Sequence, residues 1–295
     1  MSDNDKNSLP HERRQDEALT ELSKAIKSRE RQAKTAPLLV VFATVAVLAL
    51  IVGGIWFAAT YQGSNDEDAT AQSSSTSPTT TEPEVKTAAM PSGPLEPYGD
   101  SVTCEYVAGE KAAKEVSRPE GENVPATGTQ SVTLSTSDGD VNITLDNSQS
   151  PCTTHSFAHL VKEKFYNDTV CHRAVKSPNM AILQCGDPSA TGTGGPGYSF
   201  NDEFPTNGVK PDALNSPVTY KRGTLAMANS GENTNGSQFF LVTQDTTLPP
   251  KYNVFGTISE EGLATLDKIM DTKVKEGADG APEPEVRIES ATLNS

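Results

Sequence analysis

An uncharged run of 23 residues, from Pro37 to Ala59, is the feature that most restricts how this chain can fold. A helix of that length extends about 35 Å, and the hydrocarbon core of a bilayer is about 30 Å thick. A cleaved signal peptide is the alternative, but its apolar region usually has only about 7–15 residues. We therefore expect residues 37–59 to form an uncleaved transmembrane helix.

The charges on either side of this run indicate its orientation. Basic side chains come before it and acidic ones follow it, and basic flanks remain on the cytoplasmic side of a membrane. We expect a single-pass cell-membrane protein with a cytoplasmic N-terminus and with every residue after position 60 on the extracellular side. The flanking charges are Lys24, Lys27, Arg29, Arg31 and Lys34 before the run, and Asp66, Glu67 and Asp68 after it.

The segments next to the run have different compositions. Residues 1–36 form the cytoplasmic segment, and within them 9–35 have the apolar spacing of a helix, with Pro10 suited to its first turn. This helix is also a candidate for binding a partner protein. Residues 60–99 are rich in Ser, Thr and Pro and have few large apolar side chains, so we expect a disordered linker.

A strand pattern begins near residue 130. Apolar and polar residues alternate from Val132 to Leu145 around Asp138 and Gly139, which is typical of a β-hairpin. Helices are expected after Ser150 and at 260–270, and further strands at 169–175, 181–185, 224–228, 238–243, 253–258 and 286–293. For residues 130–295 we expect a mainly β fold, a closed eight-stranded antiparallel barrel capped by two helices. Residues 100–129 form an extension that packs on the barrel, with a short helix at 110–116.

Four cysteines follow the apolar run. An even number in an oxidising compartment favours two disulfides, with three possible connectivities. If Arg173 and Gln184 face each other across a hairpin, strand alternation places Cys171 and Cys185 on opposite faces, which makes a bond between those two the least favoured. The other two cysteines are Cys104 and Cys152.

Several classes of function are disfavoured. The net charge is −15 and there is no lysine-rich run, so nucleic acid is not an expected partner. His155 and His159 are four residues apart without the glutamate of a zinc-protease motif, and we expect no metal. Residues 192–197 match GxGxxG, but no helix pattern follows, so we expect no nucleotide and no other cofactor.

Two polar stretches of the sequence indicate the function. The first is Cys171-His172-Arg173 followed by Gln184-Cys185-Gly186-Asp187, and the second runs from Met227 to Phe240 as MANSGENTNGSQFF. With the segments between them, in this order over about residues 130–293, they resemble the cyclophilins, a family of peptidyl-prolyl cis-trans isomerases. The linker, apolar run and cytoplasmic segment resemble the membrane-anchored cyclophilins of Gram-positive actinobacteria.

The resemblance implies an isomerase that acts on proline-containing polypeptides folding outside the membrane. It also implies a site whose catalytic residue is Arg173 and whose orienting glutamine is Gln184. The remaining substrate-binding residues are Ala228 and Asn229 as a backbone ledge, Gln238 as a polar wall, Phe240 and Leu248 as the apolar pocket, and Ile182 and Tyr252 at two further pocket positions. Met227 is expected in the core beneath them.

The sequence departs from the family in three respects. Ten residues separate Arg173 from Gln184, about three more than is usual in the family, and Ala181 and Ile182 replace a phenylalanine and a methionine. Thr247 and Tyr252 replace a tryptophan and a histidine. We therefore expect weak cyclosporin binding. The alternative function is a proline-peptide binding or chaperone module with little turnover.

Overall fold

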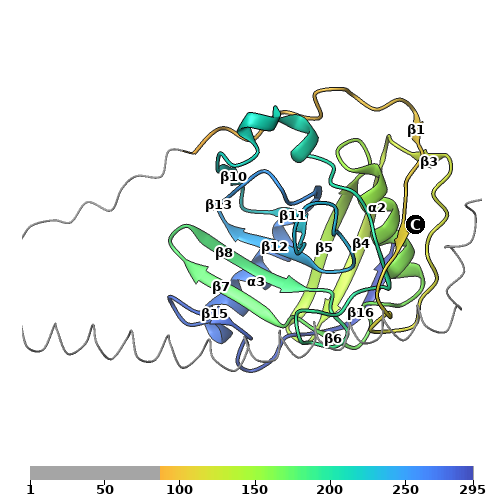
Figure 1. The fold of residues 1–295 in the computed structure, drawn as a ribbon. Helices are drawn as coiled ribbons and strands as arrows, with labels where there is room; N and C mark the ends of the chain where they lie inside the picture. The colour runs from red at the N-terminus through yellow and green to blue at the C-terminus, as the bar shows by residue number, and fades with distance from the viewer. Residues whose placement is uncertain (1–86, 295) are drawn as a thin grey trace, which may run out of the picture. The chain divides into compact units, whose positions relative to one another are not determined.

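The computed structural model of the protein describes residues 87–294, and in this part of the chain ten strands form one antiparallel sheet. The strand order is β15-β7-β8-β12-β11-β14-β5-β4-β16-β6. The sheet curls into a half-barrel, and two α-helices accompany it (Figure 1). A mainly β fold with two helices was predicted from the sequence, and it is confirmed.

The elements have the following bounds. The large sheet contains β4 (Thr129–Thr136), β5 (Gly139–Asp146), β6 (Thr169–Val170), β7 (Arg173–Ser177), β8 (Met180–Cys185), β11 (Thr224–Met227), β12 (Phe239–Gln244), β14 (Val254–Ile258), β15 (Asp279–Gly280) and β16 (Arg287–Leu293). Smaller pairs join β1 (Ser101–Val102) to β3 (Val124–Pro125), β2 (Val107–Ala108) to β9 (Tyr198–Ser199), and β10 (Val218–Tyr220) to β13 (Thr246–Leu248). The helices are α2 (Pro151–Lys162), α3 (Glu260–Lys273) and the short 3-10 turns η1 (Thr206–Gly208) and η2 (Pro211–Ala213).

The prediction of a closed eight-stranded barrel was wrong, because the two edges of the sheet are not joined by a ladder. Strands β6 and β7 lie near opposite edges and are linked by only Cys171 and His172. The Cys171 amide donates to the carbonyl of Val286, the residue directly before β16. The segment after β6 is therefore bonded to the β16 side of the sheet and not to β7. The outermost strands, β6 and β15, have two residues each, too few to close the gap.

The β4–β5 hairpin forms where the alternating pattern predicted it. Val132, Leu134, Val141, Ile143 and Leu145 are all buried. The ladder runs to the pair Thr136 and Gly139 around a two-residue turn. Gly139 has a φ of +131°, a conformation that glycine adopts without a steric penalty.

Side chains on the central strands alternate between two apolar clusters. Along β12, Phe239 and Leu241 belong to the main core, whereas Phe240 belongs to a smaller cluster. Along β8, Leu183 belongs to the main core and Ile182 to the smaller cluster, as expected when successive side chains of a strand point to opposite faces. The smaller cluster consists of Val175, Ile182, Phe204, Val218, Tyr220, Ala226, Phe240, Val242 and Val254.

Both helices bury one face in the main core. In α2 the first residue is Pro151, which lacks the amide hydrogen that would be unpaired there, and Phe157, Leu160 and Val161 are buried. Helix α3 begins after Ser259, whose hydroxyl accepts the Gly262 amide as an N-cap. Its buried side chains are Leu263, Leu266, Ile269 and Met270.

The extension of residues 100–129 lies against the domain without forming the helix expected at 110–116. Its strand β2 pairs with β9, and the Ala113 amide donates to the Gly195 carbonyl. The Lys114 ammonium donates to three carbonyl groups in the loop after α2, those of Lys164, Phe165 and Asn167. These long-range bonds take the place of the local bonds that a helix would have supplied.

Two disulfides are present, Cys104–Cys152 and Cys171–Cys185. The pairing of Cys171 with Cys185 overturns the expectation that it was the least favoured. That expectation assumed that β7 continues back through Cys171, but β7 begins at Arg173, and without a ladder the alternation of faces does not apply. The two Cα atoms lie 4.0 Å apart.

Part of the predicted linker falls within the described residues. The Ala88 amide donates to the Pro217 carbonyl, the Leu95 amide donates to the Asn207 carbonyl, and Met90 packs on the smaller cluster. The predicted transmembrane helix at 37–59 and the predicted helix at 9–35 lie outside the described residues. Between residues 87 and 294, no helix has the length and apolar character needed to cross a membrane.

Candidate active site

Three polar side chains form a connected row on one face of the sheet. Arg173 on β7 pairs directly with Gln184 on β8, and Arg173 Nη1 donates to Gln184 Oε1 over 3.2 Å. Gln184 Nε2 in turn donates to Gln238 Oε1 over 3.0 Å. The structure therefore brings together the predicted catalytic arginine, its predicted orienting glutamine and the predicted polar wall, although they are far apart in sequence.

The row ends on a loop that holds Gln238 in place. Gln238 Nε2 donates to the carbonyls of Gly192 and Gly194, each over 3.0 Å. The amides of these two glycines donate to the buried carboxylate of Asp187. Burial alone would raise the pKa of Asp187, but hydrogen bonds from Ser189 and from these amides outweigh it and lower the pKa. The GxGxxG stretch thus supports Gln238.

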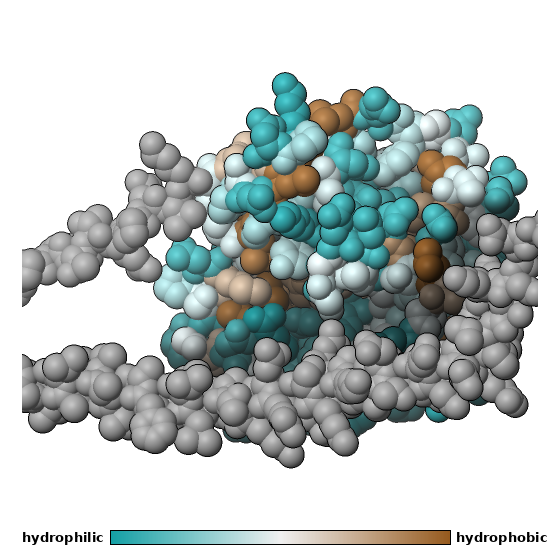
Figure 2. Space-filling model, viewed as in Figure 1, coloured by the Kyte–Doolittle hydropathy of each residue, from teal (hydrophilic) through white to brown (hydrophobic). Residues whose placement is uncertain are grey.

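An apolar patch lies beside the polar row. Phe240 and Ile182 are 2% and 1% exposed and belong to the smaller cluster, while Ala228, Leu248 and Tyr252 are partly exposed and pack against it. The rings of Phe240 and Tyr252 meet edge to face at 5.7 Å. A narrow apolar band bordered by hydrophilic residues is visible over this part of the sheet in Figure 2.

Ala228 and Asn229 follow the end of β11 on the side facing Gln238. The Ala228 amide donates to the Gln238 carbonyl over 2.9 Å, and Asn229 Nδ2 donates to the Lys251 carbonyl over 2.8 Å. Among the described residues, the backbone amide and carbonyl of Asn229 have no hydrogen-bond partner. An extended peptide that lies along this edge can bond to both groups. Met227 is buried in the main core, as expected from its place on the opposite face of β11.

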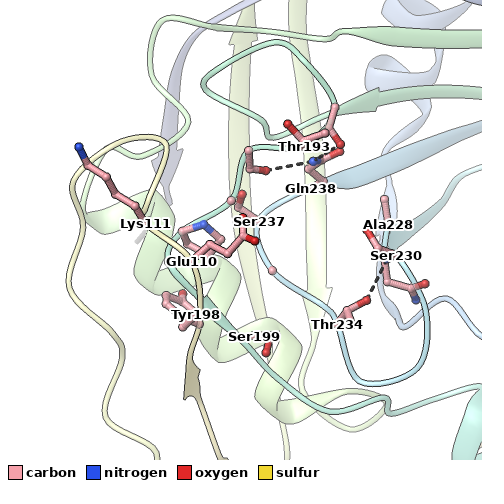
Figure 3. Close-up of a pocket in the computed structure, with 18 of the residues that line it drawn as sticks. Glu110, Lys111, Thr193, Tyr198, Ser199, Ala228, Ser230, Thr234, Ser237 and Gln238 are labelled. Atoms are coloured by element: carbon pink, nitrogen blue, oxygen red, sulfur yellow. Dashed lines mark hydrogen bonds between the residues drawn. The ribbon is translucent and has the colours of Figure 1, made fainter. Parts of the chain in front are cut away.

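A cavity of about 460 Å³ opens next to the row, since both Gln184 and Gln238 line it. Its other walls come from residues 192–199, residues 228–230 and, unexpectedly, residues 109–111 of the extension. Figure 3 shows Gln238 bonded to the loop at one end of the cavity, with Lys111 pointing away from it. The sequence carried no sign that Glu110 and Lys111 would approach the site, because the pairing of β2 with β9 is a tertiary contact.

The structure also adds Asp279, which the sequence analysis missed. Arg173 Nε donates to Asp279 Oδ1 over 2.7 Å, and Arg173 Nη2 donates to Asp279 Oδ2 over 2.9 Å. This pair raises the pKa of Arg173 and lowers the pKa of Asp279. The two residues are 106 positions apart and no local pattern links them, so only the pairing of β15 with β7 reveals their contact.

The two neighbouring histidines of α2 bond to backbone. His155 Nε2 lies 2.8 Å from the Glu120 carbonyl, and His159 Nε2 lies 2.8 Å from the Ser117 carbonyl. Between residues 87 and 294, no three side chains of the metal-binding types come together. What remains at the site is one guanidinium, two amide side chains and an apolar patch, a set that can bind a neutral peptide and stabilise a polar centre in it.

Comparisons with known proteins point to one family. Residues 131–293 match the family described as cyclophilin type peptidyl-prolyl cis-trans isomerase/CLD. A probable peptidyl-prolyl cis-trans isomerase B from Mycobacterium leprae is 52% identical over 198 residues, 65% of this chain and 67% of that protein. The protein of that name from Mycobacterium tuberculosis is 48% identical over 210 residues, 68% of either chain. A crystal structure of a Cryptosporidium parvum cyclophilin-type isomerase is 31% identical, with a TM-score of 0.45, and covers 57% of this chain and 99% of that one.

Proposed function

The chain belongs to the cyclophilin-type peptidyl-prolyl cis-trans isomerases, and we propose that Arg173 is the residue that accelerates rotation about the bond before proline. The observation that supports this role is the place of its guanidinium. It is held by Gln184, which pairs across strands with Phe240 of the smaller apolar cluster. No bond of the substrate is broken in this reaction, so the site needs no nucleophile.

The size of the barrier shows what the site must supply. Rotation about a peptide bond has a barrier of about 18–20 kcal/mol, and unaided prolyl isomerisation takes tens of seconds or more. Accelerating it to milliseconds requires lowering the barrier by roughly 5–7 kcal/mol, at about 1.4 kcal/mol for each tenfold. That stabilisation must favour the twisted amide over both planar forms.

Arg173 can discriminate between these states through the prolyl nitrogen. In a planar amide the nitrogen lone pair is delocalised into the carbonyl and accepts hydrogen bonds poorly. When the bond twists, the lone pair becomes localised on nitrogen and can accept an N–H from the guanidinium. The hydrogen bond therefore forms mainly in the twisted state, which is the condition for lowering the barrier rather than only binding the peptide.

The apolar patch holds the proline ring, and the backbone of Asn229 can bond to the chain on the other side of the rotating bond. The proline ring is apolar and fits against Phe240, Leu248 and Tyr252, while Ile182 lies below them. The chain before proline can bond to the free amide and carbonyl of Asn229, beside Ala228 and Gln238. With the ring fixed, rotation about the bond swings the chain before proline from one planar form to the other, so the bonds to Asn229 hold that chain in one form and release it as the bond twists.

The connection between Arg173 and Gln184 is longer than usual, which suggested a binding module with little turnover. This extra length does not disturb the polar row of Arg173, Gln184 and Gln238. The ladder between β7 and β8 extends from the Arg173–Gln184 pair to the Ser177–Met180 pair without a register shift. The ten intervening residues therefore extend a regular hairpin away from the site, with the turn at Pro178 and Asn179. This regular pairing favours turnover over mere binding.

We also propose where the enzyme acts. The apolar run at 37–59 and its basic N-terminal flank favour one transmembrane helix with a cytoplasmic N-terminus, so that polypeptides folding on the extracellular side are the substrates. The two disulfides are in keeping with an oxidising compartment. Protease treatment of intact cells tests this: residues 87–295 should be released while an N-terminal tag stays protected, and protection of the whole chain would contradict it.

The role of Arg173 is tested with the full-length chain in detergent and a short X-Pro peptide. Arg173→Ala should lower kcat/KM about ten- to a hundredfold, the equivalent of a charge-assisted hydrogen bond of about 1.5–3 kcal/mol. Arg222→Ala is the matched control, since Arg222 is 35% exposed against 36% for Arg173 and forms a similar bidentate pair with Asp267. Equal activity of the two variants would contradict the assignment.

A further inference from the structure

The carboxylate of Asp279 lies against the guanidinium of Arg173 on the side away from Gln184. Nε and Nη2 donate to its two oxygens, while Nη1 donates to Gln184. A guanidinium has five N–H donors, and three of them are engaged here, so two remain for a ligand. Asp279 therefore does not block the arginine; it fixes the plane in which the remaining donors lie.

The position of Asp279 is set by backbone pairing. It lies on β15, the edge strand beside β7, in register with Val175 (Figure 1). The adjoining loop is bonded to Lys176 on both sides, since the Lys176 amide donates to the Ala278 carbonyl and the Gly277 amide donates to the Lys176 carbonyl. Asp279 and Arg173 are thus attached to two paired strands, and the carboxylate has a defined place relative to the guanidinium.

An arginine held only by Gln184 would be poorly ordered. The Arg173 side chain is 36% exposed, and its bond to Gln184 is the longest of its three, at 3.2 Å against 2.7 and 2.9 Å for those to Asp279. Arginine has several rotatable bonds, and fixing them costs entropy. A bidentate carboxylate restricts the orientation of the guanidinium more than a single amide does.

We propose that Asp279 is a positioning residue for the isomerase, which orients Arg173 so that its two remaining donors face the twisted prolyl bond. This rests on the proposed role of Arg173. The carboxylate contacts Arg173 rather than the apolar patch, so its effect should fall on turnover. Removing it should lower kcat while leaving KM for a short peptide nearly unchanged, because ring binding by Phe240 and Leu248 does not involve Asp279.

The test uses Asp279→Asn in the full-length chain. Asparagine keeps the shape of the side chain but presents an NH₂ group where Arg173 needs a second acceptor, so kcat should fall about five- to tenfold. Glu276→Gln is the matched control: it removes the same charge from the loop just before β15, where Glu276 pairs with Lys176 and is 80% exposed, and it should leave kcat unchanged. Asp279→Glu, which can still bond to the guanidinium, should recover part of the activity.

A double-mutant cycle separates this inference from the proposed function. If Asp279 acts through Arg173, adding Asp279→Asn to Arg173→Ala should cause no further loss. The Nε–H resonance of Arg173 in a proton–nitrogen NMR spectrum should be protected from exchange in the native chain and lost in Asp279→Asn. If Asp279→Asn is as active as the native chain, or more active, while Arg173→Ala is crippled, Asp279 does not position the arginine. If Arg173→Ala is itself fully active, that result contradicts both the proposed role of Arg173 and this inference about Asp279.

Discussion

Gln184 on β8 and Gln238, the residue directly before β12, are joined by a 3.0 Å hydrogen bond between their side chains, and this bond makes the polar row one unit. Gln184 can accept from Arg173 only if its Oε1 faces β7, and the bond from its Nε2 to Gln238 fixes that orientation. Gln238 is oriented in turn by the carbonyls of Gly192 and Gly194. The direction of the arginine therefore depends on a chain of amides that ends in the loop around Asp187.

The first prediction concerns this series of hydrogen-bonded amide side chains. Gln184→Ala removes both the acceptor for Arg173 and the donor for Gln238, and it should lower kcat/KM about three- to tenfold, as expected for a hydrogen bond worth about 0.5–1.5 kcal/mol. Gln244→Ala is the control, because Gln244 is an exposed glutamine on β12. A peptide isomerisation assay in which both variants match the native chain would show that the arginine needs no amide partner.

Cyclosporin binding should be weak, and the structure shows where it can be strengthened. Thr247 lies on β13 next to Leu248 and is partly exposed. Thr247→Trp adds a large apolar ring with one N–H donor at this position, and the affinity should rise by about tenfold or more. Calorimetric titration of both chains with cyclosporin measures the change. Nanomolar affinity of the native chain would contradict the prediction.

The two disulfides should have different consequences when they are removed. They close loops of 48 and 14 residues, and the loop-entropy estimate gives about 4 and about 3 kcal/mol of stabilisation for Cys104–Cys152 and Cys171–Cys185. The first joins the extension to α2, far along the chain from Arg173. The second lies two residues before Arg173 and directly after Gln184.

Both double alanine variants should unfold at lower denaturant concentration. Only the variant without Cys171–Cys185 should also lose turnover at a temperature where both are folded, because only that bond holds the strands that carry the polar row. Urea titration and peptide isomerisation on the same samples make the comparison. Equal turnover of the two variants would show that the β7–β8 ladder positions Arg173 without help from the disulfide.

How much of this could be predicted from the sequence depends on the range of each interaction. The hairpin from Val132 to Leu145 and the helices at 151 and 260 follow from local periodicity, and the structure has them. The row of Arg173, Gln184 and Gln238 was found by resemblance, since nothing local links two residues on separate strands with one that precedes a third strand. The alternation argument worked for Met227, which lies within a strand, and failed for Cys171, which lies just outside one.

Asp279 and the extension mark the limit of sequence reasoning here. Asp279 looks like any loop aspartate until β15 is placed beside β7, and Glu110 looks like part of a helix until β2 is placed beside β9. In both cases a two-residue strand at an edge decides the geometry, and such short strands have no periodicity to detect. The closure of the sheet was misjudged for a related reason, because it depends on how its outermost short strands pair.

The last prediction concerns Glu203, a buried residue whose carboxylate lies against the first turn of α2. Its carboxylate accepts the amides of Cys152 and Thr153 and the hydroxyl of Thr153. Burial nevertheless prevails over these bonds and raises the pKa of Glu203 to about 7, from 4.5 for an ordinary glutamate. Between these two pH values the folded chain holds a proton that the unfolded chain has lost.

The free energy of unfolding should therefore fall as the pH rises from about 4.5 to about 7 and then level off, by on the order of 3 kcal/mol from this group. His155, whose pKa is lowered by burial, contributes a slope of the opposite sign, so the comparison must be made with Glu203→Gln at each pH. The Glu203→Gln variant cannot titrate at this position. Its free energy of unfolding, minus that of the native chain, should therefore increase steadily as the pH rises toward neutral. Urea unfolding without reductant at several pH values between 5 and 8 measures this difference. A difference that is the same at every pH would mean that Glu203 remains ionised in the folded protein, with its three donors outweighing the cost of burial.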